Sequence, residues 1–136
     1  EFYAAAKKRL APDGIMQIWI VEPMEPVELS AFAQAIKNSF PYVRVFRSLE
    51  GWGYHCLASR DPIPPYTAAE LAARMPQAAV RDLVEMGPRK TGVKQFQALL
   101  STERPLDSLI LPNAEGLRDD RPLNEYFFLR RGLARD

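Results

Sequence analysis

The stretch that decides the fold is "APDGIMQIWIV", residues 11–21, in which a turn leads directly into an apolar run. Pro12 cannot continue a helix, and Asp13–Gly14 supplies a tight turn. The residues from Ile15 to Val21 are apolar except for Gln17, which is typical of a strand covered on both faces in a parallel α/β sheet. We therefore predict a central strand here, with Gln17 as its one polar side chain.

Helical patterns lie on both sides of this strand. Residues 1–10 place apolar side chains at helical spacing and end in three basic residues, which favour the last turn of a helix. From Leu29 to Phe40 the apolar residues fall on one helical face, and the pattern ends before Pro41. These patterns predict a short helix before the strand and a crossover helix after it.

Two further strands are expected next. "YVRVFRS" (residues 42–48) alternates apolar and polar side chains, which indicates a strand near a sheet edge. "LEGWG" (49–53) is a turn, and "YHCLAS" (54–59) is predicted to return antiparallel to the preceding strand. The first 61 residues therefore favour an α/β fold that ends in an antiparallel hairpin.

The remaining residues, 62–136, are predicted to form a helical extension. It begins with a proline-rich connector, and Thr67 with Glu70 forms a capping-box pattern before the first of three apolar helical stripes. We interpret "DDRPLNEYFFLRR" (119–131) as the segment that fastens the end of the chain, rather than as a reactive site. Either a capped helix or an edge strand fits residues 122–131.

Composition excludes several classes of function. The chain has 18 Lys and Arg against 17 Asp and Glu, a net charge of +1, so no nucleic-acid partner is expected. No apolar run approaches the roughly 20 residues of a membrane span, so no membrane contact is expected. One cysteine and one histidine form neither an internal disulfide nor a zinc site of several ligands. We expect a cytoplasmic location and no metal.

No catalytic residue is predicted in the chain. His55 and Cys56 are adjacent on a predicted strand, so their side chains point to opposite faces and cannot act as base and nucleophile. None of the seven glycines forms a GxGxxG or P-loop pattern after a strand. The chain is therefore expected to bind no nucleotide by itself.

The candidate binding residues are Gln17 and Trp52. Gln17 either presents its amide to a ligand at the carboxyl end of a central strand or is a buried amide satisfied by neighbouring backbone. Trp52 either walls a pocket or caps the hydrophobic core. For Glu22 and Glu25, just beyond the strand, a solvated loop is favoured over contact with a charged substrate.

Four stretches together resemble the C-terminal half of spermidine synthase-like proteins, the polyamine aminopropyltransferases built on the class I methyltransferase-like fold. They are "EFYAAAKKRLAPDGIMQIWI" (1–20), "SFPYVRVF" (39–46), "GWGYHCLAS" (51–59) and "DDRPLNEYFFLRR" (119–131). The resemblance covers nearly the whole chain. It implies that residues 1–61 are the C-terminal half of a methyltransferase-like (Rossmann-like) α/β domain, namely its last strands with an antiparallel hairpin, and that the extension 62–136 packs on it.

The function implied by this resemblance is transfer of an aminopropyl group from decarboxylated S-adenosylmethionine to putrescine, which yields spermidine and methylthioadenosine. The amine attacks a carbon next to a sulfonium, so carboxylates must hold the cationic amine and help to remove its proton. The family's nucleotide loop and acidic catalytic loop are expected before Glu1. We therefore expect the chain alone to be inactive and to bind no cofactor, decarboxylated S-adenosylmethionine being a co-substrate of the parent protein.

The resemblance also assigns the two candidate residues. Gln17 stands where the family carries a glutamine near the substrates, and Trp52 stands near an aromatic of the hairpin beside the polyamine pocket. "SLEGWG" (48–53) replaces the family's Tyr-Pro turn, so another substrate stays open. The alternatives are a methyltransferase that uses S-adenosylmethionine itself and a noncatalytic interaction module. A sheet that lacks its natural neighbour has an open edge, so we also expect self-association.

Overall fold

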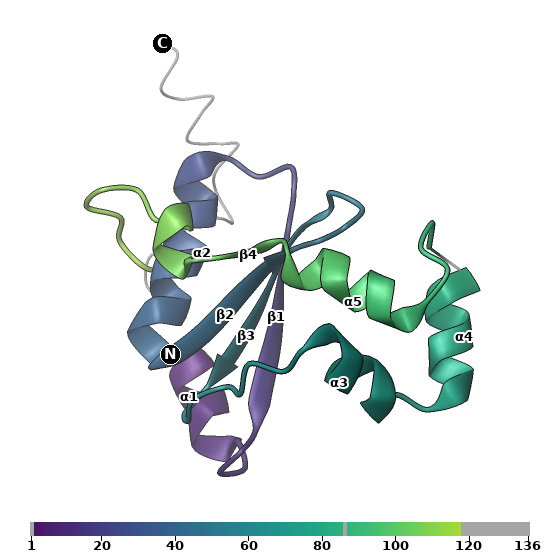
Figure 1. The fold of residues 1–136 in the computed structure, drawn as a ribbon. Helices are drawn as coiled ribbons and strands as arrows, with labels where there is room; N and C mark the ends of the chain where they lie inside the picture. The colour runs from purple at the N-terminus through teal and green to yellow at the C-terminus, as the bar shows by residue number, and fades with distance from the viewer. Residues whose placement is uncertain (1, 86, 118–136) are drawn as a thin grey trace.

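The computed structural model describes residues 2–85 and 87–117, which form a mixed α/β fold with a four-stranded sheet (Figure 1). The elements are α1 (Phe2–Arg9), β1 (Ile15–Val21), α2 (Pro26–Ser39), β2 (Tyr42–Arg47), β3 (Gly53–Ser59), α3 (Ala68–Arg74), α4 (Gln77–Glu85), α5 (Gly92–Leu100), β4 (Glu103–Arg104) and the 3-10 helix η1 (Leu106–Leu109). The strand order is β1-β3-β2-β4, and neighbouring strands are antiparallel. The predicted α/β class is confirmed at this level.

β1 is placed differently from the prediction. Within the described residues it pairs with β3 alone, so it lies at the edge of the sheet and its neighbour is antiparallel. Its side chains alternate between exposed and more buried positions, and Ile15, Trp19 and Val21 are all exposed. The prediction of a central strand buried on both faces was wrong. Apolar residues on both faces of a strand do not show whether other elements pack against both faces.

The predicted hairpin of β2 and β3 is confirmed. A glycine at the start of β3 allows the hairpin to lie close to β1. β3 runs antiparallel to both β1 and β2, so β1 and β2 point in the same direction on either side of it. Gly53, which opens β3, has a φ of 115°, and a Cβ there would lie 2.0 Å from the carbonyl oxygen of Ile20. A side chain at this position is therefore excluded by both conformation and contact.

The hydrophobic core lies on one face of the sheet, which we call the core face, under α1 and α2 (Figure 1). Ile36 of α2 and Val45 of β2 are fully buried, as is Cys56 of β3. Tyr3 and Leu10 pack against the same cluster from the region of α1. Burial of each large aliphatic side chain stabilises the fold by about 1.5–3 kcal/mol, so this face is the main source of stability.

The three predicted helices of the extension are present as α3, α4 and α5. The capping box before α3 is confirmed: Thr67 Oγ1 accepts from the amide of Glu70, and the Glu70 carboxylate accepts from the amide of Thr67. In Figure 1 these helices lie on the side of the sheet opposite α1 and α2. Their side chains approach the second face, which we call the open face and which carries Gln17, Trp19, Arg44, Phe46, His55 and Leu57.

The chain after α5 returns to the sheet and then crosses α2, which the sequence did not predict. β4 pairs with β2 in a two-residue ladder, so the extension contributes a strand as well as helices. Beyond η1, the amide of Leu111 donates to Ser30 Oγ at 2.7 Å, and Leu117 donates to the carbonyl of Ala31 at 3.3 Å. Lys37 of α2 binds Asp107 at 2.6 Å. This segment closes the outer side of the core face.

Among the described residues, no helix has both the length and the apolar character that crossing a membrane requires. The interpretation of "DDRPLNEYFFLRR" as a terminal fastening, in helical or strand form, falls on residues 119–131, which lie outside the described residues.

Candidate ligand-binding site

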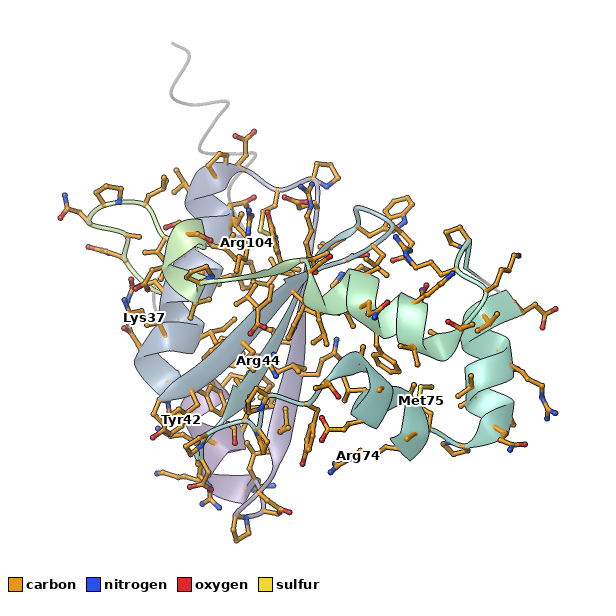
Figure 2. The ribbon with its side chains drawn as sticks, viewed as in Figure 1. Lys37, Tyr42, Arg44, Arg74, Met75 and Arg104 are labelled. Atoms are coloured by element: carbon orange, nitrogen blue, oxygen red, sulfur yellow. The ribbon has the colours of Figure 1, made fainter. Side chains whose placement is uncertain are left out.

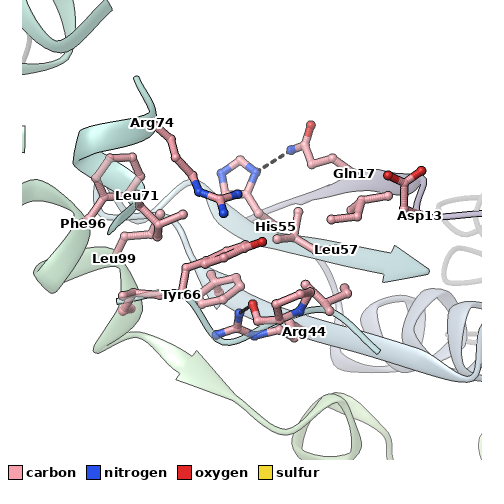
Figure 3. Close-up of a pocket in the computed structure, with 15 residues that line it drawn as sticks. Asp13, Gln17, Arg44, His55, Leu57, Tyr66, Leu71, Arg74, Phe96 and Leu99 are labelled. Atoms are coloured by element: carbon pink, nitrogen blue, oxygen red, sulfur yellow. Dashed lines mark hydrogen bonds between the residues drawn. The ribbon is translucent and has the colours of Figure 1, made fainter. Parts of the chain in front are cut away.

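A cavity of about 710 Å³ lies between the open face of the sheet and the extension (Figure 3). The sheet forms its floor, the connector before α3 forms one wall, and α3 and α5 form the other. Its apolar lining consists of Ile15, Phe46, Leu57, Ile63, Pro64, Leu71, Phe96, Leu99 and Leu100, and its polar lining of Asp13, Gln17, Arg44, His55, Tyr66 and Arg74. An apolar cavity with a few polar groups is the usual form of a small-molecule site.

Gln17 is exposed on the open face and faces this cavity, where its amide nitrogen lies 2.8 Å from His55 Nδ1 (Figure 3). The alternative of a buried amide held by neighbouring backbone is therefore wrong. Gln17 is the third of the seven residues of β1, so it also lies away from the carboxyl end of the strand. A side-chain amide nitrogen donates hydrogen bonds, so this contact selects the His55 tautomer in which Nδ1 accepts and Nε2 carries the proton.

Trp52 does not line the cavity. It lies in the hairpin turn with 62% of its surface exposed, so it does not cap the core either. Its backbone carbonyl accepts a hydrogen bond of 3.2 Å from the indole nitrogen of Trp19, and the Trp19 ring stacks on His55 with centroids 6.4 Å apart. Among the described residues, contacts through His55 and Trp19 link Gln17 to Trp52, and Trp52 is not one of the residues that line the cavity beside Gln17.

Arg44 projects from β2 toward the connector, where its Nη1 donates to the carbonyl of Pro64 at 3.4 Å (Figure 2). Its Nε and Nη2 atoms each donate to the carboxylate of Glu103 at 2.7 Å, a bidentate pair. Hydrogen bonding to Glu103 raises the pKa of Arg44, and the same pair lowers the pKa of Glu103. Arg44 therefore fastens β2 to β4 and brings little free charge to the cavity.

Arg74, at the end of α3, stands at the mouth of the cavity. Its guanidinium carbon lies 3.8 Å from the centre of the Tyr66 ring, which is a close cation–π contact. In the part of the chain that the structure describes, no carboxylate lies within 4.0 Å of this guanidinium to form an ion pair. The nearby Glu70 is occupied by Thr67, from which it accepts two hydrogen bonds.

The carboxyl end of β1 presents a second group of polar and aromatic side chains. Glu22 is half-buried and pairs with Arg47 at 3.4 Å, so it is not merely part of a solvated loop. Its backbone amide donates to the carbonyl of Trp52 at 3.3 Å, which holds the hairpin turn against the end of β1. Trp19 and Trp52 are both largely exposed beside this turn, and the Glu22 carboxylate is bound to Arg47.

Cys56 lies on the core face, opposite the cavity. It is fully buried on the core face, and burial raises the pKa of its thiol to about 12. His55, one residue earlier, lines the cavity on the open face. Because the thiol stays protonated at neutral pH and lies on the other face, the two residues form no nucleophile–base pair.

The sequence predicted Gln17 but not the residues that surround it. His55 was considered only as a partner of Cys56, although the period of two in a strand already placed it on the face opposite that cysteine. Arg74 and Tyr66 are eight residues apart across the capping box and carried no recognisable motif. Among residues 2–85 and 87–117, no group of three or more His, Cys, Asp or Glu side chains is arranged to hold a metal ion.

Comparisons with known proteins found no relative of this chain. No protein-family model matches the chain, and no curated protein and no solved structure matches it.

Proposed function

We propose that this chain is the C-terminal part of a spermidine synthase-like aminopropyltransferase and that it is inactive by itself. The observation that carries the proposal is the strand order β1-β3-β2, in which β3 runs antiparallel between two strands that share one direction. This arrangement agrees with the last strands and hairpin of a methyltransferase-like sheet. The edge position of β1 further supports the proposal, because among the described residues no strand pairs with its other side, where a preceding strand of that sheet would lie.

The proposed place for the amine substrate is the carboxyl end of β1. Trp19 and Trp52 offer exposed aromatic surfaces that attract an alkylammonium, and Glu22, which pairs with Arg47 at 3.4 Å, directly follows the strand. Ligands of open α/β sheets bind beyond the carboxyl ends of strands, which is the location of this group. The cavity beside Gln17 lies elsewhere on the open face, so we assign the amine to the group around Trp52.

The reaction would join an amine nitrogen of putrescine to the carbon of the aminopropyl group that is bonded to the sulfonium sulfur. As that C–N bond forms, the bond from carbon to the sulfonium sulfur breaks and its electron pair leaves with methylthioadenosine. The attacking amine loses one proton to a carboxylate base, which the resemblance locates outside this chain. A cytoplasmic location is part of the proposal, and the buried free thiol of Cys56 is compatible with it.

The test is an assay of the protein expressed from its complete reading frame. With decarboxylated S-adenosylmethionine and putrescine we expect release of methylthioadenosine and spermidine in equal amounts, measured by chromatography. Trp52→Ala should raise the KM for putrescine about tenfold, whereas Trp52→Phe should retain most of the affinity. Absence of methylthioadenosine, together with methyl transfer from S-adenosylmethionine, would replace this function by that of a methyltransferase.

A noncatalytic interaction module is the second candidate, and one observation favours it. Ile15, Trp19 and Val21 form an exposed row along β1, next to backbone groups that have no strand partner among the described residues. We propose that this edge also supports self-association by strand pairing. Sedimentation equilibrium of the purified chain should show a dimer that Val21→Lys weakens, while a monomer at all concentrations would contradict self-association.

A further inference from the structure

We propose that the cavity on the open face binds an organic anion with an apolar body, such as an arylalkyl carboxylate. This site is separate from the amine site proposed at Trp52, and it does not depend on the function proposed above. The cavity of about 710 Å³ is large enough for a small organic molecule, and nine of its fifteen lining residues are apolar. Its polar groups decide the charge of the ligand.

Arg74 supplies the charge that an anion would meet. Tyr66 holds the guanidinium from one side at 3.8 Å, which orders the cation without neutralising it. Figure 3 shows the side chain of Arg74 extending into the cavity. A guanidinium that has no carboxylate within ion-pairing distance in the described chain, and that is already oriented by a ring, fits a carboxylate or sulfonate.

His55 supplies a second donor. Gln17 Nε2 lies 2.8 Å from Nδ1, and an amide nitrogen that donates there selects the tautomer with its proton on the ring Nε2. Among the described residues, no acceptor is within hydrogen-bond distance of that nitrogen, which belongs to a half-buried side chain of the cavity lining. Gln17 is therefore a positioning residue: it fixes the imidazole so that the ring offers a donor to the ligand.

The balance of charges opposes a cationic ligand. Asp13 is the one carboxylate in the cavity lining, and Figure 3 shows it at the end of the cavity remote from Arg74. Arg44 is already paired with Glu103, whereas Arg74 makes no ion pair within 4.0 Å among the described residues and interacts with the Glu70 carboxylate only at longer range. A polyamine would place its ammonium groups near this cation, and a neutral apolar ligand would leave the donors of Arg74 and His55 without an acceptor.

The test compares two ligands that share one apolar body, 4-phenylbutyrate and 4-phenylbutylamine, by isothermal titration calorimetry on the purified protein. We expect 4-phenylbutyrate to bind at least about tenfold more tightly than the amine, as one charge-assisted hydrogen bond implies. Arg74→Gln should weaken the carboxylate about tenfold and leave the amine unchanged or slightly stronger. Arg81→Gln, on the exposed surface of α4 outside the cavity, is the matched control and should change neither.

Two further readouts separate binding from a structural effect. The 15N chemical shifts of the His55 ring should report the Nε2–H form, and addition of 4-phenylbutyrate should move the Nε2 signal. Thermal unfolding should show that both variants are folded at the temperature of the titration, with a lower midpoint for Arg74→Gln than for Arg81→Gln because only Arg74 contacts the Tyr66 ring. Equal affinity for the two ligands, no detectable binding of the carboxylate, or equal losses in both variants would overturn the proposal.

Discussion

The two faces of the sheet are built from alternate residues of the same strands, yet they have different covers. On the core face, Ile36, Val45 and Cys56 are completely enclosed beneath α1 and α2. On the open face, Gln17 and His55 line a cavity that α3 and α5 leave partly open. The same strands therefore provide a packed interior on one side and an accessible, partly polar surface on the other.

This difference shows how stability and binding are divided in the molecule. Dense packing on the core face tolerates little change, since each buried aliphatic group contributes directly to the free energy of unfolding. The open face tolerates polar side chains because solvent and the cavity hydrate them. Substitutions on the core face should accordingly change stability, and those on the open face should mainly change binding.

The largest expected effect comes from opening the core face. Ile36→Ala removes a fully buried side chain beneath α2 and should lower the free energy of unfolding by about 3 kcal/mol. Leu99→Ala, on the wall of the cavity, should cost only about 1 kcal/mol because Leu99 is half-buried and already borders an open space. Urea denaturation measures both, and equal losses would show that the two faces do not differ in packing.

A second effect concerns the join between the hairpin and β1. Gly53→Ala should destabilise the protein by about 2 kcal/mol or more, because the new Cβ would collide with the carbonyl of Ile20 and the backbone has a φ of 115°. Gly51→Ala is the control: its φ is 80°, but no atom lies within 4 Å of the added Cβ. If the two variants lose equal stability in urea, the close approach to β1 is not important.

A third effect is the pH dependence of the core face. The thiol pKa of Cys56 is about 12 in the folded protein against an ordinary value of 9.0, so folding favours the protonated form. Its contribution is fully present below about pH 9 and is lost as pH rises toward 12, because the unfolded thiol ionises first. Cys56→Ala should therefore show a shallower fall of stability above pH 9, measured by urea denaturation. Identical pH slopes would contradict the assignment.

The smallest effect is expected where β4 joins the sheet. The pKa of Glu103 is lowered by Arg44, so the pair stabilises the fold above the ordinary glutamate pKa and is lost as pH falls through the lowered value. The carboxylate is partly exposed, which limits the change to less than about 1 kcal/mol. In Arg44→Gln the pKa of the Glu103 carboxyl, followed by 13C NMR, should be higher than in the unaltered protein. An unchanged pKa would show that Arg44 does not stabilise the ionised carboxylate.

Most elements of the fold were predictable from local patterns. The crossover helix, the hairpin and the capping box at Thr67 have signals that lie within about fifteen residues, and all are present. The position of β1 was not predictable, because its apolar residues reveal a preference for burial and not the number of neighbours. β4 was missed because two charged residues, Glu103 and Arg104, form a strand through pairing with β2 and not through their own propensity.

The site was predicted only in part for a related reason. Gln17 stood out as a polar residue in an apolar strand, whereas His55 and Arg74 gained their significance from residues distant in the sequence. Trp52 was correctly placed in the hairpin turn, but the structure separates it from Gln17. Pairings across the sheet and contacts with the extension determine which polar groups meet, and no local pattern contains that information.

The most direct test of this account is hydrogen–deuterium exchange along β1 in the protein expressed from its complete reading frame. We propose that β1 is the edge at which the rest of a methyltransferase-like sheet joins. The account predicts slow exchange for all amides of β1, both those that pair with β3 and those that point away from it. Rapid exchange confined to the amides that point away from β3 would contradict the claim and leave β1 as a free edge.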